Sequence, residues 1–370
     1  MHPRNPLARR ATLFALAIAL FWAALYVYVP NLAVHARSLG ASDTMIGLII
    51  GSYGFTQLLL RIPLGVASDR LAMRKGFIVL GFLATAVSSV ALALARSPAH
   101  QLAARAVAGI AASSWVASTV LFASFYPASQ AVRSTSIMSL ASSSGQMVAT
   151  LAGGYVAARL GLTAPFWVSA VIALTGLAVI APIAEESGGR GSAPTFSQIL
   201  SVLTLPSLLL VSLVAATSQY AAFATSYTFV PIYASEVLGL DSAQIGVLTS
   251  AVLVPYAIMT TFVAGLSTKA REECLVSVGL LLLGLTTVAT VLAGSFTALL
   301  SARSLFGVGM GLTYPVLMGM SIKNIPQARR ASAMGAFQAI YALGMTVGPA
   351  VSGFISDQFG LQAVFWTTGL

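Results

Sequence analysis

Long apolar runs alternate with short polar segments along the whole chain. A helix needs about 20 residues to cross the ~30 Å hydrocarbon core of a bilayer, because each residue advances it by about 1.5 Å. Runs of this kind lie near residues 12–34, 44–66, 76–95, 99–122, 136–158, 164–184, 205–232, 243–266, 274–293, 297–320 and 331–355. A twelfth run begins at Gln362, and the sequence stops at Leu370. The pattern predicts an all-α, multi-pass membrane protein with eleven complete spans and a truncated twelfth helix.

One polar segment is longer than the others. Residues 185–195 read Glu-Glu-Ser-Gly-Gly-Arg-Gly-Ser-Ala-Pro-Thr, a composition typical of a flexible linker. The segment follows the sixth apolar run and divides the chain into two sets of six. We predict an N-terminal six-helix bundle at 1–184, a cytoplasmic linker at 185–204, and a C-terminal bundle at 205–370 that is incomplete at its end.

The two sets of runs resemble each other. Short motifs recur at an offset of 198 to 201 residues: Leu39-Gly40 with Leu238-Gly239, Val29-Pro30 with Val230-Pro231, Arg105 and Gly109 with Arg303 and Gly307, and Gly161-Leu162 with Gly360-Leu361. Chance would not keep the offset so constant. A six-helix unit written twice in one orientation predicts a pseudo-two-fold axis along the membrane normal, with a binding site between the halves near the midplane.

Composition agrees with a membrane protein, and the placement of charge gives its orientation. Only 8% of the residues are charged and 58% are hydrophobic, whereas soluble domains carry about 25% charged residues. If the N-terminus is cytoplasmic, thirteen Lys and Arg residues lie inside and three lie outside, as the positive-inside rule requires. The net charge of +10 is therefore a topology signal and gives no support to nucleic-acid binding.

The segment 61–75 combines an arginine within an apolar run with a glycine, an acid and several bases. Arg61, Gly65 and Asp69 are spaced by four residues, so a helix places them along one face. Arg70 and Arg74 follow at the end of the apolar run, where the chain must turn in water before it returns to lipid.

These residues carry a family resemblance. The stretch 65–75, Gly-Val-Ala-Ser-Asp-Arg-Leu-Ala-Met-Arg-Lys, resembles the loop 2–3 motif Gly-x-Leu-x-Asp-Arg-x-Gly-Arg-Lys of the major facilitator superfamily of secondary transporters. Stretches 105–109 and 303–309 resemble the helix-4 motif Arg-x-x-x-Gly-x-Gly, and 145–154 and 344–353 resemble the glycine-rich motif of exporting members. Positions 67, 72 and 73 depart from the first motif, and Ala149-Thr150 replaces the Gly-Pro of the last in helix 5.

The resemblance implies a gate that closes the cytoplasmic side. Asp69 would face the positive N-terminal end of helix 11, near Ala331, in the opposite half. Glycine spacing in helices 5 and 11 has an alternative explanation, because small residues four apart also allow close packing of membrane helices. The gating residues that the resemblance implies are Gly65, Asp69, Arg70, Arg74, Gly145, Gly153, Gly344, Gly348 and Pro349.

Three arginines lie within apolar runs, where each costs about 2.5–3.5 kcal/mol to insert. For Arg105 and Arg303 a structural role, bonded to neighbouring helices, competes with a role in transport, while Arg61 is expected to line the cavity. Helices 1, 4, 7 and 10 line the cavity in the family. The candidate substrate pathway is Tyr26, Gln57, Arg61, Arg105, Gln219, Tyr220, Arg303 and Tyr314.

The carboxylates lie at helix ends or in loops, and none falls in the middle of a run. This argues against the usual proton-coupled export of cationic drugs; protons remain a candidate coupling ion only if Asp69 or an acid at the outer mouth titrates. One cysteine and three scattered histidines offer no metal site or cofactor site and no cluster for an enzyme, and a receptor would not need the doubled pattern.

We therefore expect a monomeric alternating-access carrier of a small molecule in a bacterial inner membrane. The glycine motifs favour export of small amphipathic compounds. The membrane arginines, without a membrane acid, favour the alternative of uptake or exchange of an organic anion.

Overall fold

The computed structural model describes residues 6–71, 73–127, 130–185, 205–266, 270–326 and 329–370, and the regular structure within these ranges is helical. The N-terminal half contains α1 (Pro6–Tyr26), α2 (Val29–Ser38), α3 (Asp43–Arg70), α4 (Arg74–Ala93), α5 (Pro98–Ser113), α6 (Trp115–Ala123), α7 (Ala131–Leu160) and α8 (Ala164–Ile180). The C-terminal half contains α10 (Pro206–Ala221), the π-helix η2 (Ala222–Phe229), α11 (Val230–Glu236), α12 (Ser242–Leu266), α13 (Glu272–Leu292), α14 (Phe296–Lys323), α15 (Arg330–Phe359) and α16 (Leu361–Gly369). The predicted linker lies outside the described residues, except for Glu185.

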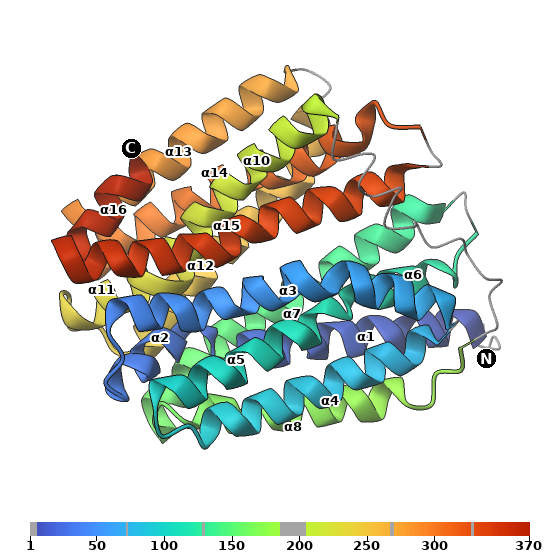
Figure 1. Cartoon of the computed structure of the whole chain (residues 1–370), viewed down its shortest axis with the longest axis horizontal. Helices are drawn as coiled ribbons and strands as arrows, with labels where there is room; N and C mark the ends of the chain where they lie inside the picture. Colours follow the sequence, from blue (N-terminus) through green and yellow to red (C-terminus); the bar gives the residue numbers. More distant parts are fainter. Residues whose placement is uncertain (1–5, 72, 128–129, 186–204, 267–269, 327–328) are drawn as a thin grey trace, which may run out of the picture.

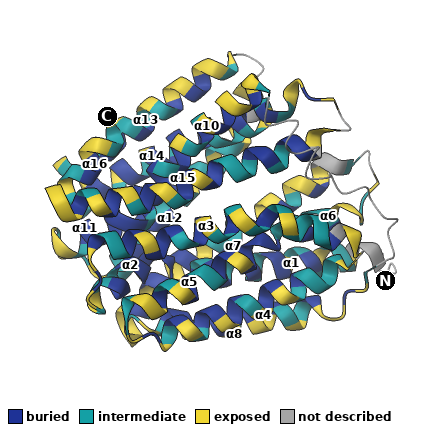
Figure 2. Cartoon of the chain, in the orientation of Figure 1, coloured by how far each residue is buried: buried dark blue, intermediate teal, exposed yellow. Residues whose placement is uncertain are grey.

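The eleven predicted spans coincide with helices. In the described part of the chain, nine helical segments are long and apolar enough to cross a membrane. The other two are α7, whose segment 139–146 holds four serines and a glutamine, and α8, which has 17 residues. Large apolar side chains such as Leu80, Val87 and Phe262 point outward, each about 60% exposed, and Figure 2 shows exposed positions along the outer faces of both halves. This surface suits a lipid environment.

The fourth predicted span is divided at Ser114 into α5 and α6, and two further spans that the sequence presents as single runs are interrupted. The first breaks between α1 and α2, and the seventh passes through η2 before α11. Both breaks precede the repeated Val-Pro pairs, and Pro30 and Pro231 lack the N–H that would continue the hydrogen bonding of the preceding turn. In η2, the hydroxyl of Thr228 donates to the carbonyl oxygen of Phe223 at 2.6 Å.

The backbone turns repeat as the sequence does. The glycines with positive φ in the described chain are Gly40 (83°), Gly161 (92°), Gly239 (64°) and Gly360 (86°). They form two pairs related by the repeat offset, Gly40 with Gly239 and Gly161 with Gly360. Each turn needs a left-handed residue, which glycine adopts without steric cost.

The halves lie side by side, with their helices roughly parallel (Figure 1). The chief contacts between them are α3 against α15 and α7 against α12, two pairs that the repeat relates to each other. We call the end that carries Arg70, Arg74, Lys323 and Arg330 the basic end, and the end that carries the turns after α2 and α11 the far end.

Contacts between the halves gather toward the far end. A Cβ added at Gly47 or Gly51 of α3 would meet backbone atoms of α15, and the Cα atoms of Gly154 and Gly246 approach so closely that a Cβ on Gly154 would lie 2.7 Å from the Cα of Gly246. Toward the basic end, a Cβ at Gly335 of α15 would meet no heavy atom within 4 Å. The described interface is thus tight at the far end and looser at the basic end.

Candidate substrate pathway and the far-end contact

An aromatic group lies where the halves meet, midway along the helices. Tyr26 of α1 and Tyr227 of η2 contact edge to face, with ring centroids 6.1 Å apart. Trp22 packs against both Tyr26 and Trp115. These four side chains are partly exposed although they face the interior, and the indole nitrogen of Trp22 has no hydrogen-bond partner among the described residues. Such amphipathic surface at depth is suited to contact a substrate.

Arg61 lies at the boundary between the halves. Its Nη1 donates to the hydroxyl of Tyr341 on α15 at 2.8 Å, and its Nη2 donates to Oε1 of Gln57 at 2.7 Å. Both of these partners are neutral, and its Nε has no partner among the described residues. Toward the basic end from this point, Gly65 of α3 approaches Val116 of its own half. Arg61 therefore marks the place where the tight part of the interface ends.

Arg105 and Arg303 are held within their own halves. Arg105 donates to the hydroxyl of Tyr28 at 2.8 Å and lies 4.2 Å from the ring centroid of Tyr53. Arg303 is completely buried; it donates to the carbonyl oxygen of Thr286 at 3.2 Å and to the hydroxyl of Thr290 at 3.0 Å. These contacts match the structural role that the sequence left open for both arginines.

The remaining pathway candidates occupy different environments. Tyr314 packs edge to face on Tyr341, with centroids 5.6 Å apart, and so lies beside Arg61. The hydroxyl of Tyr220 lies 3.3 Å from that of Ser352 on α15, and Gln219 is buried. The structure brings Gln57, Arg61 and Tyr314 together and places Tyr220 in a contact within the C-terminal half.

Sequence reasoning missed two members of this group, Tyr53 and Tyr341. Tyr53 could have been found, because it extends the four-residue spacing of Gln57 and Arg61 along the same face of α3. Tyr341 is brought to Arg61 only by the packing of α15 on α3, and no local sequence pattern predicts this contact.

The predicted gate at the basic end stays a prediction. The side chain of Asp69 and that of Ala331 lie outside the described residues, and Arg70 is exposed. The backbone N–H of Arg74 donates to Oε1 of Glu185 at 2.9 Å, so Glu185 caps α4 within the N-terminal half.

The predicted gating glycines pack helices inside each half. A Cβ at Gly145 of α7 would collide with the carbonyl oxygen of Ala19 in α1, and one at Gly153 with that of Val27, which follows the end of α1. Gly344 and Gly348 face α10 in the equivalent way, with a Cβ at Gly348 only 2.8 Å from the carbonyl oxygen of Tyr220. These contacts are those that the packing alternative requires, and a gating role for the four glycines stays a prediction.

Pro349 lies on the boundary between the halves. Its carbonyl group points at Gly47 of α3, where a side chain would not fit. Of the glycine-motif residues assigned to gating, Pro349 therefore contacts the opposite half directly.

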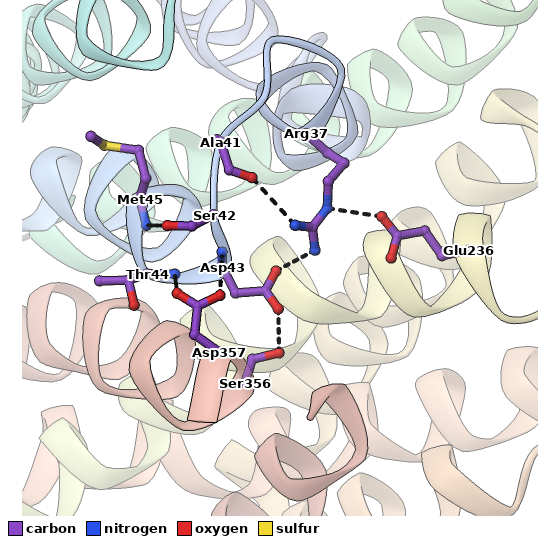
Figure 3. Close-up of polar contacts among 9 residues, drawn as sticks. All are labelled: Arg37, Ala41, Ser42, Asp43, Thr44, Met45, Glu236, Ser356 and Asp357. Atoms are coloured by element: carbon purple, nitrogen blue, oxygen red, sulfur yellow. Dashed lines mark hydrogen bonds and ion pairs between the residues drawn. The ribbon is translucent and has the colours of Figure 1, made fainter. Parts of the chain in front are cut away.

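A polar network joins the halves at the far end (Figure 3). Arg37 of α2 forms ion pairs with Asp43 of α3 and, through Nε at 2.8 Å, with Oε1 of Glu236 on α11. Arg37 also donates to the carbonyl oxygen of Ala41 at 3.3 Å. One guanidinium thus connects two segments of its own half to the opposite half.

The second part of this network involves the end of α15. Asp357 accepts hydrogen bonds from the backbone N–H of Asp43 at 2.9 Å and of Thr44 at 2.8 Å. The hydroxyl of Ser356 donates to Oδ2 of Asp43 at 2.5 Å. A local cap is present as well: Oγ of Ser42 accepts from the N–H of Met45 at 3.2 Å.

Comparison with known proteins agrees with this architecture. The family model described as Major Facilitator Superfamily matches residues 14–242 and 208–370. The inner membrane transport protein YajR of Escherichia coli is 26% identical over 98% of this chain and 80% of its own length. The quinolone resistance protein NorA of Staphylococcus aureus is 25% identical over 34% of this chain and 32% of its own length. A solved bacterial homologue of the human lysosomal transporter Spinster, described as inward-facing and unoccupied, superposes with a TM-score of 0.81 at 19% identity, covering 96% of this chain and 84% of that one.

Proposed function

The chain belongs to the Major Facilitator Superfamily, and we propose that it exports small amphipathic compounds by alternating access. The observation that carries this proposal is the uneven contact between the halves, which is tight at the far end and looser beyond Arg61. A carrier of this design opens its central site to one side of the membrane at a time.

The proposed orientation places the basic end in the cytoplasm of a bacterial cell. Arg70, Arg74, Lys323 and Arg330 gather there, as expected for cytoplasmic segments. The relative YajR is named as an inner membrane protein. In this orientation the looser side of the interface faces the cytoplasm, as expected of a state that loads a substrate for export.

The proposed substrate site combines aromatic surface with a few polar groups. Trp22, Tyr26, Trp115 and Tyr227 supply apolar surface with polar edges, and Arg61 with Gln57 supplies hydrogen-bond donors. Ligand sites of this kind bind the apolar body of a compound by area and orient it by one or two polar contacts. Export is further supported by the partial similarity to the resistance protein NorA.

Transport into inverted membrane vesicles tests this proposal. We expect uptake of neutral and cationic amphipathic dyes by vesicles that contain the protein, with lower uptake by the Tyr26→Ala variant. Tyr155→Ala is the matched control, because Tyr155 is 54% exposed on α7 and faces away from the pathway. No uptake of any amphipathic compound in either vesicle orientation would contradict export.

A second function, uptake or exchange of an organic anion, is favoured by one observation. Arg61 is buried at the boundary between the halves and its described partners are Tyr341 and Gln57, which are neutral. A charge at this depth is costly without a counter-charge, and an anionic group of the substrate would supply one. Proteoliposomes offered carboxylates and uncharged analogues of the same shape decide between the two functions: selective transport of the carboxylates, lost in Arg61→Gln, favours the anion.

Proton coupling and a monomeric state belong to the proposal as expectations. Substrate-dependent proton movement in proteoliposomes would establish coupling, and an unchanged internal pH during transport would exclude it.

A further inference from the structure

The first turn of α3 is capped in a way that its repeat equivalent is not. In α12 the cap is local: Oδ1 of Asp241 accepts from the N–H of Gln244 at 2.8 Å, and Oε1 of Gln244 accepts from the N–H of Asp241 at 3.0 Å. In α3, Ser42 caps one N–H. Two further N–H groups, of Asp43 and Thr44, donate to Asp357 in the opposite half.

The carboxylate of Asp357 therefore serves as a helix cap from a distance of more than 300 residues in sequence. The N-terminus of a helix carries a partial positive charge and unsatisfied N–H groups, and both oxygens of Asp357 are used to satisfy them. The backbones of α15 and α3 are in close contact at this point, because a Cβ at Gly353 would collide with Asp43 and would lie 2.8 Å from the Cα of Thr44. The cap forms only when the ends of α3 and α15 touch.

The neighbouring bonds divide between the halves in the same way. Asp43 pairs with Arg37 in its own half and accepts from Ser356 in the other. Arg37 in turn binds Glu236 across the boundary. Separation of the halves at the far end would break the bonds of Asp357, Ser356 and Glu236 to the N-terminal half together, and it would hydrate the groups that made them.

We propose that Asp357, with Ser356 and the Arg37–Glu236 pair, is a latch that holds the far end of the carrier closed. This inference rests on the proposed alternating access and adds to it the residues that set how often the far end opens. A contact made in only one of two states shifts the equilibrium toward that state by its own free energy. Loss of the latch therefore favours the far-open state. The carrier then opens at the far end more readily and closes there less readily.

Distance measurements between spin labels test the latch in the full chain in lipid nanodiscs. The single cysteine, Cys274, is exposed and is first replaced by serine. Labels are then placed at Ser38 and Val237, two exposed positions on opposite sides of the far-end boundary. We expect Asp357→Ala to raise the population of the longer distance roughly two- to fivefold, the range of a charge–dipole contact, with a smaller rise for Ser356→Ala.

Asp241→Ala is the matched control. It removes a helix cap at the same end of the molecule, but one that lies within a single half, and it is expected to leave the distance distribution unchanged. Arg37→Gln provides a second variant should Asp357→Ala fail to fold.

The outcomes separate the latch from the proposed function. In one outcome, a transported compound populates the longer distance, whereas Asp357→Ala, Ser356→Ala and Arg37→Gln do not. The latch is then wrong, while alternating access stands. A distance that never changes, with any compound or variant, overturns both. A shift in Asp241→Ala equal to that in Asp357→Ala would also overturn the latch, because general loss of helix capping would explain it.

Discussion

Tyr26 and Tyr227 occupy equivalent positions in the two repeats, 201 residues apart, and their rings meet edge to face across the boundary between the halves with centroids 6.1 Å apart. Residues that are equivalent under a two-fold axis can contact each other only if they lie on that axis. The pair therefore marks the pseudo-symmetry axis at the level of the aromatic group.

Removal of one ring from this pair should weaken substrate binding. Aromatic pairs contribute about 0.5–1.5 kcal/mol beyond the area they bury, which corresponds to roughly two- to tenfold in apparent KM. We expect Tyr227→Ala to raise the KM of an amphipathic substrate by this factor in vesicle transport. Tyr155→Ala at the exposed surface of α7 should change it little, and an equal effect of the two variants would contradict the assignment.

Arg61 and Arg303 should respond differently to the same change. Arg303 is sealed among Thr286, Thr290 and Ser226, so Arg303→Gln leaves buried groups without partners and should lower the free energy of unfolding by about 1–3 kcal/mol. Arg61→Gln should reduce transport at least tenfold with a smaller effect on stability. Thermal unfolding in micelles and transport in proteoliposomes measure the two effects, and a loss of stability alone in Arg61→Gln would remove it from the pathway.

The substitution Gly153→Ala should destabilise the N-terminal half. An added Cβ would collide with the backbone of Val27, just after the end of α1, and overpacking of this kind costs about 1–3 kcal/mol. Gly335→Ala is the control, because its Cβ would enter open space within α15 and alanine favours a helix by about 0.5–1 kcal/mol over glycine. Thermal unfolding of the two variants should therefore shift in opposite directions. Equal shifts would mean that backbone flexibility, and not the contact with Val27, decides the result.

The pair of Arg37 and Glu236 should tolerate exchange of its charges. The two side chains are 33% and 45% exposed, so their coupling free energy is expected at about 0.2–1 kcal/mol. Arg37→Glu or Glu236→Arg alone should increase far-end opening in the spin-label assay, and the double variant should recover part of the closed population. Recovery will be partial, because Arg37 also binds Asp43. Additive effects in a double-mutant cycle would show that the pair is not coupled.

Much of the fold could be predicted because it depends on local patterns. Length and polarity of the runs determine the spans, and the turn glycines at 40, 161, 239 and 360 recur because the same turns recur. The Val-Pro pairs at 29–30 and 230–231 were visible as a repeated motif, but neither the breaks in front of them nor the π-helix at Ala222–Phe229 was predicted. Its geometry depends on bonds such as that of the Thr228 hydroxyl, which periodicity does not reveal.

The site was less predictable, because its partners come from distant parts of the chain. Arg61 could be identified as an unusual residue in a membrane span, but its partner Tyr341 is 280 residues away. Asp357 looks like an ordinary polar residue at the end of a helix. Its role emerges only when α15 lies beside α3 and presents it to Asp43 and Thr44.

The charges of Arg37 and Glu236 also bear on how the halves recognise each other during assembly. Because the two positions are equivalent in the repeat and meet across the boundary, two copies of the N-terminal half paired in the same manner would set arginine against arginine. Two copies of the C-terminal half would set glutamate against glutamate. Like charges at this position disfavour both pairings. The difference between the two duplicated residues therefore favours association of the two unlike halves of one chain over association of like halves from different chains.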